Sequence, residues 1–394
     1  MASAQGGVAG REAAVLGAGR QGTAAAFDLL RFGGAARVRL IDADPVRLSD
    51  AALRLQHLGL GDSLETAAVD ATDERALAKA LEGAVTAVCA LPYRLGPAAA
   101  RAALAAGCSL ADLGGNTEIS RRILELDRPA RERGVCLVPD TGLAPGLANT
   151  LAADGLRRLP AARSVRIWCG GLPQTPIPPL GYRQVFSIEG LLNEYSGDAV
   201  YLRGGEIVRV PALSEREELE LPGVGRVEAF PTSGGTSTAP ETFRGRLDTY
   251  EYRTVRYPGH LERFKTLADL GLLGEEKIPA GDGHVRPRDL LIRLLAPLID
   301  RPDVPDLVVL RVEVEAPEDA APRRVIYDLL DREDRETGFT AMERCTAHPA
   351  AVVAEMAAAG EIDPGAQRLE TGVPPEPFLE RLARRPLALT VREE

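Results

Sequence analysis

The sequence predicts an α/β protein with an N-terminal Rossmann domain, built on a doubly wound parallel sheet, and a second α+β domain of mostly antiparallel sheet. Short apolar runs alternate with helical patterns up to residue 138, which is typical of a parallel sheet with crossover helices. After residue 146 strand patterns dominate, and few helices separate them. We place the first domain at residues 1–148, the second at 149–335, and at 336–394 a segment whose helix returns to the first domain.

A glycine fingerprint opens the first domain. A short apolar strand at residues 13–16 leads into Gly17, Gly19 and Gly22, and a helical pattern follows. The first glycine permits a tight turn, the second lets the backbone approach a pyrophosphate, and the third lets helix and strand pack closely. The second strand ends at Asp42, 20 residues after Gly22, where a carboxylate would accept hydrogen bonds from a ribose 2′-hydroxyl.

The cofactor that this fingerprint predicts is NAD. The carboxylate of Asp42 would repel the 2′-phosphate of NADP, whereas the nearby Arg37 and Arg47 keep NADP open. The remaining alternative is a Rossmann-like domain that has lost its ligand.

The ends of the later strands supply further candidates for the cofactor site. We expect these strands at residues 66–69, 85–91, 109–113 and 135–138. In a doubly wound sheet the ligand lies beyond the carboxyl ends of the strands, although ordinary turn chemistry explains each following residue alone. The predicted cofactor-binding residues are Gly17, Gly19, Arg20, Gln21, Gly22, Asp42, Asp70, Ala71, Leu91, Pro92, Leu113, Gly114 and Asn116.

Turn signals and alternation predict the strands of the second domain. The glycine pair at 204–205 predicts a hairpin turn, and residues 306–316 and 323–333 predict an antiparallel pair. Near the C-terminus, residues 347–360 predict a helix that begins at a His-Pro pair. Four alternating residues before that region would share one face of a strand: Tyr250, Tyr252, Thr254 and Arg256.

Composition and charge argue against several classes of protein. The chain has 394 residues and a net charge of −10, which disfavours nucleic acid or an anionic membrane as a partner. No run approaches the roughly 20 apolar residues of a membrane span, and the N-terminus lacks a signal-peptide pattern, so we expect a cytoplasmic protein. The five cysteines are widely spaced and predict buried free thiols, and the four histidines lack metal-ligand spacing, so we expect no zinc site.

Motifs from about residue 13 to about residue 360 carry a family resemblance. They include VLGAGRQG, ADLGGNTEI, VPDTGLAPGLANTLA, EAFPTSGGTST and EYRTVRYPGH. Together they resemble the saccharopine dehydrogenase superfamily, for which VPDTGLAPG is diagnostic. FPTSGGTST followed by YRTVRYPGH is similar to the lysine 6-dehydrogenase-like group. Saccharopine reductases typically carry an aspartate where this chain has Ala144, which weakens a saccharopine interpretation.

The resemblance implies oxidative deamination of a primary amine at the end of a side chain. Hydride passes to NAD and water hydrolyses the imine, so that L-lysine would give ammonia and a semialdehyde. This chemistry needs a base, for which the candidates are Asp140 in the superfamily motif, then His260, then Lys265. The alternatives are that Asp140 caps the following turn and that His260 is a packing residue. Tyr93 could touch the nicotinamide or the substrate amine, and the resemblance also implies a homodimer or higher oligomer.

The second domain supplies the candidates for substrate binding. A cation must hold the substrate carboxylate, and an arginine suits bidentate contact with it. For Arg256, the alternative is that it is a solvated strand residue. The loop SGGTST at 233–238 lacks the lysine of a Walker loop, so we interpret it as a substrate loop, with a flexible hairpin as the alternative. The predicted substrate-binding residues are Arg183, Ser233, Thr236, Tyr252 and Arg256.

Two other functions compete with the amine dehydrogenase. One is an NADP-dependent reductase that joins an amine to a semialdehyde, as saccharopine reductase does. The other is a protein that binds NAD without turnover.

Overall fold

The chain folds into two compact units, neither of which is one continuous segment. The computed structural model describes residues 8–317 and 323–394. The first unit runs up to Arg157 and adds Glu343–Leu387, and the second comprises Arg158–Met342 and Ala388–Glu394. The predicted boundary after residue 148 falls inside a helix, α7, most of which stays with the first unit.

The first unit is a doubly wound parallel sheet, as predicted. Its strands follow the order β17-β6-β5-β4-β1-β2-β3, and all neighbours are parallel. The six strands predicted from the sequence are present, and the seventh, β17, comes from the C-terminal segment. The strands are β1 (Glu12–Leu16), β2 (Arg37–Asp42), β3 (Leu64–Ala68), β4 (Thr86–Cys89), β5 (Ser109–Asp112), β6 (Cys136–Val138) and β17 (Gly365–Ala366).

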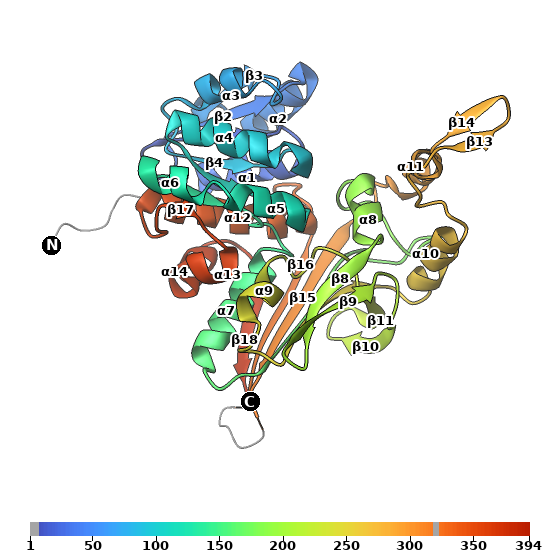
Figure 1. Ribbon diagram of the computed structural model, residues 1–394. Helices are drawn as coiled ribbons and strands as arrows, with labels where there is room; N and C mark the ends of the chain where they lie inside the picture. Colours follow the sequence, from blue (N-terminus) through green and yellow to red (C-terminus); the bar gives the residue numbers. More distant parts are fainter. Residues whose placement is uncertain (1–7, 318–322) are drawn as a thin grey trace. The chain divides into compact units, whose positions relative to one another are not determined.

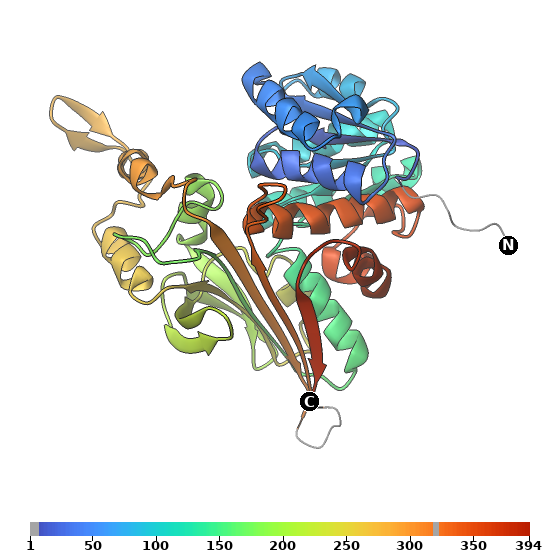
Figure 2. The same ribbon diagram turned by 180° about the vertical axis from the view of Figure 1, so that it is seen from behind.

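Helices cover both faces of this sheet. α3 and α4 lie toward the viewer in Figure 1, and α1 and α12 in the reverse view of Figure 2. Local signals set their ends; for example, Asp44 caps α2 by accepting a hydrogen bond from Val46 N at 2.9 Å. The helices are α1 (Arg20–Arg31), α2 (Pro45–His57), α3 (Glu74–Leu81), α4 (Gly96–Ala106), α5 (Thr117–Leu124), α6 (Asp127–Arg133), α7 (Leu147–Arg158), α12 (Ala341–Ala359), α13 (Leu369–Gly372) and α14 (Pro375–Leu382).

The second unit is built on a mixed, mostly antiparallel sheet, so the predicted fold class is confirmed. The order β10-β11-β12-β7-β15-β16-β18 forms its main path, and β8 joins through β12 and pairs with β9. Its strands are β7 (Ser164–Pro173), β8 (Asp198–Arg203), β9 (Glu206–Pro211), β10 (Glu217–Leu221), β11 (Gly225–Phe230), β12 (Thr249–Arg256), β15 (Asp306–Glu315), β16 (Arg324–Arg332) and β18 (Leu389–Glu393).

Local sequence signals hold well in this unit. The glycine pair at 204–205 turns the β8–β9 hairpin, and β15 pairs antiparallel with β16. The alternating residues of β12 from Tyr250 to Arg256 are all buried on one face. The remaining elements are α8 (Ile188–Glu194), α9 (Ala239–Phe243), α10 (His260–Asp269), α11 (Pro287–Ile299) and the small hairpin β13 (Ile278–Ala280) with β14 (Gly283–Val285).

The C-terminal helix α12 is longer than predicted. We expected it to start at the His348-Pro349 pair, but it begins at Ala341 and Pro349 lies inside it. The carboxylate of Asp306 accepts hydrogen bonds from the backbone N–H groups of Ala341 (2.8 Å) and Met342 (3.0 Å). This distant cap satisfies N–H groups that a helix start leaves open, so the helix begins about two turns before the proline.

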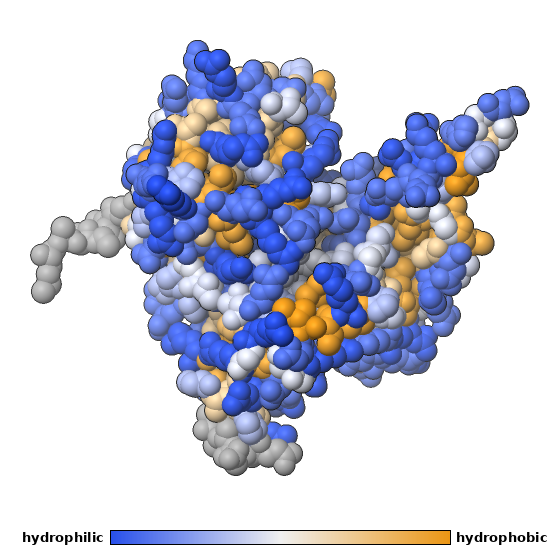
Figure 3. Space-filling model, in the orientation of Figure 1, coloured by the Kyte–Doolittle hydropathy of each residue, from blue (hydrophilic) through white to orange (hydrophobic). Residues whose placement is uncertain are grey.

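The face of the molecule in Figure 3 is mainly hydrophilic, with separate hydrophobic patches. No helix within residues 8–317 and 323–394 has the length and hydropathy that a membrane crossing requires.

Candidate active site

The glycine loop between β1 and α1 has the geometry of a nucleotide-binding turn. A Cβ atom at Gly22 would lie 1.7 Å from the carbonyl oxygen of Gly17, so only glycine lets α1 pack against this turn. A Cβ at Gly19 would meet nothing within 4 Å, and both Gly19 and Arg20 are exposed. The open N-terminal end of α1 therefore presents backbone N–H groups to an incoming phosphate.

Asp42 is joined to the glycine loop by hydrogen bonds. Its Oδ2 accepts from Ala18 N at 2.7 Å, and its Oδ1 accepts from Asp44 N at 2.9 Å. The parallel register that pairs Leu16 with Ile41 brings the two strand ends together. The carboxylate is thereby fixed at the edge of the loop, where the ribose of a bound dinucleotide would lie.

Two predicted cofactor residues have visible structural roles. Asp70 is exposed and accepts a hydrogen bond from Thr72 N at 2.9 Å, a backbone contact that lowers the pKa of the carboxyl. Asn116 caps α5 by accepting from Ile119 N at 3.2 Å. Turn chemistry therefore accounts for both side chains, and their contact with a cofactor stays a prediction.

The other predicted residues of this unit lie at strand ends or in the glycine loop. Gln21 is half-buried in α1, and Ala71 is buried after β3. Leu91 and Pro92 follow β4, and Leu113 follows β5. Their contact with a cofactor also stays a prediction.

Asp112 ends β5, and Asp140 follows the adjacent strand, β6. Asp140 is buried, has a φ of +63°, and its Oδ1 accepts a hydrogen bond from Ser120 Oγ at 2.8 Å. A Cβ at Gly114 would lie 2.2 Å from that oxygen, so the loop after β5 packs directly on the carboxylate. A non-glycine residue held at positive φ is strained, and such strain is often kept at functional sites.

Asp112 is a buried carboxyl that the sequence analysis missed. It ends β5, its Oδ2 accepts from Gly114 N at 3.0 Å, and its pKa rises to about 6 because burial disfavours the charged form. Its backbone oxygen accepts from both N and Oγ1 of Thr141, which ties the two aspartate loops together. Tyr93 packs beside this region, 3.6 Å from a Cβ placed at Gly115.

In the second unit, Arg256 is the centre of a buried polar cluster. β12 places Tyr252, Thr254 and Arg256 on one buried face, as predicted. The guanidinium of Arg256 donates from Nε to Tyr195 OH at 2.8 Å and from Nη1 to Val255 O at 2.9 Å. Among the described residues, no carboxylate lies within ion-pair distance of Arg256, although the negative charge of Glu194 acts on it.

His260 joins this cluster with both ring nitrogens bonded. Its Nε2 is 2.9 Å from Tyr195 OH and its Nδ1 is 2.9 Å from Leu180 O. Burial, with Arg256 nearby, lowers the pKa of His260 to about 3. A base needs a free nitrogen to take a proton from the substrate, so this geometry favours the packing alternative for His260.

The remaining substrate candidates have other partners. Ser233 Oγ donates to Asn193 O and Thr236 Oγ1 donates to Val200 O, both at 2.9 Å. Gly235 lies against the Tyr252 ring, where a Cβ would come within 2.2 Å of a ring carbon. Ser233 and Thr236 thus bond within their own unit and Gly235 makes room for the Tyr252 ring, whereas a Cβ at Gly234 would meet nothing within 4 Å. Contact between this loop and a substrate stays a prediction.

Arg183 is buried away from these contacts. Its Nη1 donates to Val304 O and lies 3.7 Å from Glu333. The third base candidate, Lys265, pairs with Asp269 at 3.4 Å on the exposed face of α10. Each of these two charges therefore has a carboxylate within ion-pair distance, unlike the charge of Arg256.

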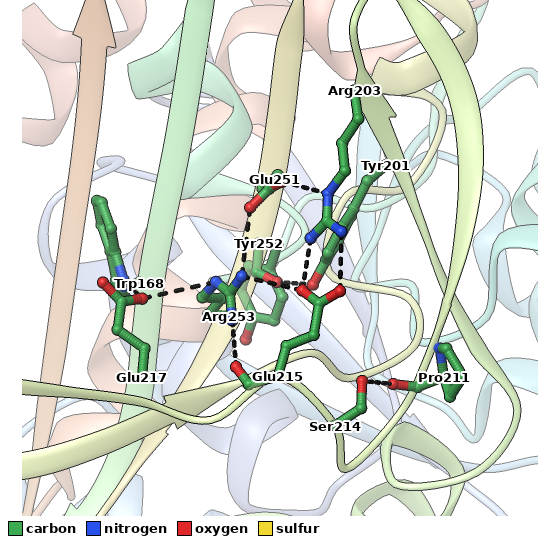
Figure 4. Close-up of polar contacts among 10 residues, drawn as sticks. All are labelled: Trp168, Tyr201, Arg203, Pro211, Ser214, Glu215, Glu217, Glu251, Tyr252 and Arg253. Carbon is green, nitrogen blue, oxygen red and sulfur yellow. Dashed lines mark hydrogen bonds and ion pairs between the residues drawn. The ribbon is translucent and has the colours of Figure 1, made fainter.

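On the opposite face of β12, the arginine Arg253 is paired with carboxylates, in contrast to Arg256. Figure 4 shows Arg253 beside Glu215 and Glu217, with Arg203 held by Glu215 and Glu251. A pocket of about 410 Å³ lies there, lined by Arg166, Ile167, Trp168, Glu215, Arg216, Glu217, Glu251 and Arg253. Its charges neutralise one another, so we do not assign substrate binding to it.

Three further residues of the Arg256 cluster were missed by the sequence analysis: Tyr182, Glu194 and Tyr195. Ser187 caps α8, whose buried face (Ile188, Leu191) leads to Tyr195 at the helix end. The spacing of Ile188, Leu191 and Tyr195 is that of one helix face, and it could have predicted that this tyrosine is buried. Burial raises the pKa of Glu194 to about 7, an effect that no local pattern reveals.

The described residues contain no group of three His, Cys, Asp or Glu side chains placed to hold a metal ion. All five cysteines are buried and free.

Comparisons with known proteins agree with this architecture. Residues 13–138 match the saccharopine dehydrogenase NADP binding domain, and residues 142–387 match the saccharopine dehydrogenase C-terminal domain. The structure of apo saccharopine dehydrogenase (L-Glu forming) from Saccharomyces cerevisiae superposes with a TM-score of 0.77 and 19% identity, covering 98% of this chain and 100% of that one. At this identity the likeness shows the fold.

Curated relatives match over part of the chain. The NADP(+), L-glutamate-forming saccharopine dehydrogenase of Pyricularia oryzae is 28% identical over 171 residues, which are 41% of this chain and 38% of the relative. The Saccharomyces cerevisiae protein of the same name is 26% identical over 218 residues, 53% of this chain and 48% of the relative. The matches thus span less than half the length of these relatives. Because the two family domains together extend over most of the sequence, the chain belongs to the saccharopine dehydrogenase family.

Proposed function

We propose that this chain is an NAD-dependent oxidoreductase that deaminates the terminal amine of L-lysine or a similar amino acid. Hydride passes from the amine-bearing carbon to NAD⁺, giving NADH and an imine, and water converts the imine to the semialdehyde and ammonia. The observation that carries the proposal is the buried guanidinium of Arg256, which has hydrogen bonds but no carboxylate partner among the described residues. A buried unpaired charge is costly, so it is expected to serve a negatively charged ligand.

The base of this reaction stays a prediction. Asp140 is the first candidate from the sequence, and Asp112 is a second buried carboxyl at the end of the adjacent strand, β5. A pKa of about 6 at Asp112 suits proton transfer near neutral pH.

A second candidate function is NADP-dependent saccharopine chemistry. It is supported by the description of the matching family domain and by the names of the relatives. Asp42 and Ala144 favour the first proposal, because a carboxylate beside the ribose opposes a 2′-phosphate.

The proposed function is tested by NADH absorbance with purified protein at mildly alkaline pH. We expect L-lysine to drive reduction of NAD and to drive reduction of NADP at least about tenfold more slowly, given one unfavourable charge contact of about 1.4 kcal/mol. Ornithine, diamines and saccharopine serve as comparison substrates. Turnover of saccharopine with NADP alone would establish the second candidate, and NAD binding without turnover of any amine would leave a non-catalytic protein.

Cofactor choice is expected to depend on Asp42. Asp42→Asn keeps an oxygen for Ala18 N but removes the charge, so we expect kcat/KM for NAD to fall and that for NADP to rise, each by roughly tenfold. Asp44→Asn is the matched control, because asparagine caps a helix as well as aspartate does. An unchanged NAD to NADP ratio in Asp42→Asn would contradict the role given to this carboxylate.

A further inference from the structure

A chain of hydrogen bonds connects Leu180 to Arg256 inside the second unit. It runs from Leu180 O to His260 Nδ1 (2.9 Å), from His260 Nε2 to Tyr195 OH (2.9 Å) and from Tyr195 OH to Arg256 Nε (2.8 Å). Tyr195, Arg256 and His260 are at most 2% exposed, so water does not compete for these bonds. Tyr195 follows directly after α8, Arg256 ends β12, and His260 begins α10.

The chemistry of its two ends fixes the direction of every bond. A carbonyl oxygen only accepts, so His260 Nδ1 must donate to Leu180 O. A guanidinium only donates, so the Tyr195 oxygen accepts from Arg256 Nε and its O–H is left to donate to His260 Nε2. His260 is therefore a neutral imidazole in one tautomer, and its lowered pKa agrees with this assignment.

The imidazole itself is held in place from two sides. Glu228 on β11 accepts hydrogen bonds from the N–H groups of Gly259 (3.1 Å) and Leu261 (2.7 Å), which fixes the backbone around His260. The ring stacks on Phe264 at 4.7 Å between centroids and meets Tyr182 edge-on at 5.5 Å. These contacts hold the plane of the ring in the cluster.

Arg256 is fixed in turn, and one nitrogen of its guanidinium has no hydrogen-bond partner among the described residues. The centre of the guanidinium lies 5.1 Å from the Tyr182 ring and 5.8 Å from the Tyr195 ring. Nε and Nη1 are engaged, whereas Nη2 has no hydrogen-bond partner in the described part of the chain. An anion that met this edge would find an arginine already in position, which reduces the entropy lost on binding.

We infer that His260 and Tyr195 are positioning residues, which lock the guanidinium of Arg256 so that its free edge binds the carboxylate of the substrate. The identity of that carboxylate rests on the proposed function, whereas the lock itself rests on the hydrogen bonds alone. This assignment replaces the role of His260 as a base, because neither ring nitrogen is free.

The first readout is the exchange with water of the Arg256 Nε proton, followed by NMR on ¹⁵N-arginine-labelled protein, with Arg256→Lys to identify the signal. We expect Tyr195→Phe and His260→Leu to speed this exchange at least about tenfold, since a buried hydrogen bond is lost. His260→Gln, which can still donate and accept, should restore much of the protection. Tyr257→Phe is the matched control. It removes a buried hydroxyl that donates to Pro173 O at 2.9 Å and takes no part in the hydrogen bonds between Leu180 and Arg256.

The second readout is a split between kinetic constants. For Tyr195→Phe we expect the KM for L-lysine to rise about five- to tenfold with kcat within about twofold, since the binding that is lost is the same in the ground state and the transition state. Inhibition by 1,5-diaminopentane, which lacks the carboxylate, should not change. Unchanged exchange of the Arg256 proton in both Tyr195→Phe and His260→Leu, with folding verified by thermal unfolding, would overturn the inference. The protein could oxidise no amine and still show slow exchange of the Arg256 proton that these variants speed up. That result would support the positioning role of His260 and Tyr195 and would reject only the proposed function.

Discussion

Replacing Arg256 with leucine is expected to lower kcat/KM for L-lysine by roughly 10²–10³-fold, because losing one partner of a buried charge pair costs about 3–4 kcal/mol. The guanidinium is buried, and it is fixed by Tyr195 and Val255. Arg256→Lys keeps the charge but not the planar fork, so we expect it to recover only part of the loss. Steady-state NADH formation measures the effect.

Arg253 provides the control for this experiment. It lies on the same strand, three residues earlier, but on the opposite face, where Glu215 and Glu217 pair with it. Arg253→Leu should therefore leave kcat/KM within about threefold, because its charge is already satisfied away from the Arg256 cluster. Equal losses in the two variants would mean that Arg256 acts through stability and has no special role toward substrate.

Replacing Arg385 with leucine is expected to lower the free energy of unfolding of the first unit by about 3–5 kcal/mol. Asp28 in α1 is fully buried and receives hydrogen bonds from Arg385 Nη2 at 2.7 Å and Nε at 3.1 Å. Arg385 also contacts Glu355, and His348 Nδ1 lies 2.6 Å from Asp28 Oδ2. Without Arg385, the Asp28 carboxylate would stay buried with too little positive charge around it.

This loss is measured in urea, with hydrogen exchange of the backbone amides in α1 and α12 as the probe. Tryptophan fluorescence would not report on the first unit, because the single tryptophan, Trp168, lies in the other unit. Arg128→Leu is the control in the same unit: its pair with Glu132 is 89% and 61% exposed, and such surface pairs contribute about 0–1 kcal/mol. Burial pushes the pKa of Asp28 up, but Arg385 and His348 outweigh it and hold the pKa below 3.8. The stabilisation should therefore be present above that pH and be lost as the pH falls further. A change below about 1 kcal/mol in Arg385→Leu would refute the role of the cluster.

The sequence predicted those features that depend on neighbouring residues. Glycine spacing and the acidic residue at a strand end predicted the nucleotide fold, and alternation placed Tyr252 and Arg256 on one face of β12. The glycine pair at 204–205 predicted a hairpin turn. Each of these patterns is contained within a few tens of residues, where helix and strand periodicity apply.

Features made by distant contacts could not be predicted in this way. The partner of Arg256, Tyr195, is 61 residues away, and Leu180 is 80 residues from His260. The start of α12 depends on Asp306, 35 residues earlier. The loop SGGTST looked like a ligand loop because its glycines allow close approach, but the group that approaches Gly235 is the ring of Tyr252. A pattern can show that a close contact exists without showing what makes it.

The division of the first unit along the chain has a consequence for synthesis on the ribosome. Its sheet receives β17 at the edge of β6, and Asp28 receives Arg385, only after residues 158–342, most of the second unit, have been translated. Until then the nascent first unit carries an unpaired strand edge, which is a site for incorrect strand pairing. The part of the protein that is made first is thus among the last to be completed, and the second unit in turn receives its last strand, β18, only after Arg385 has been made.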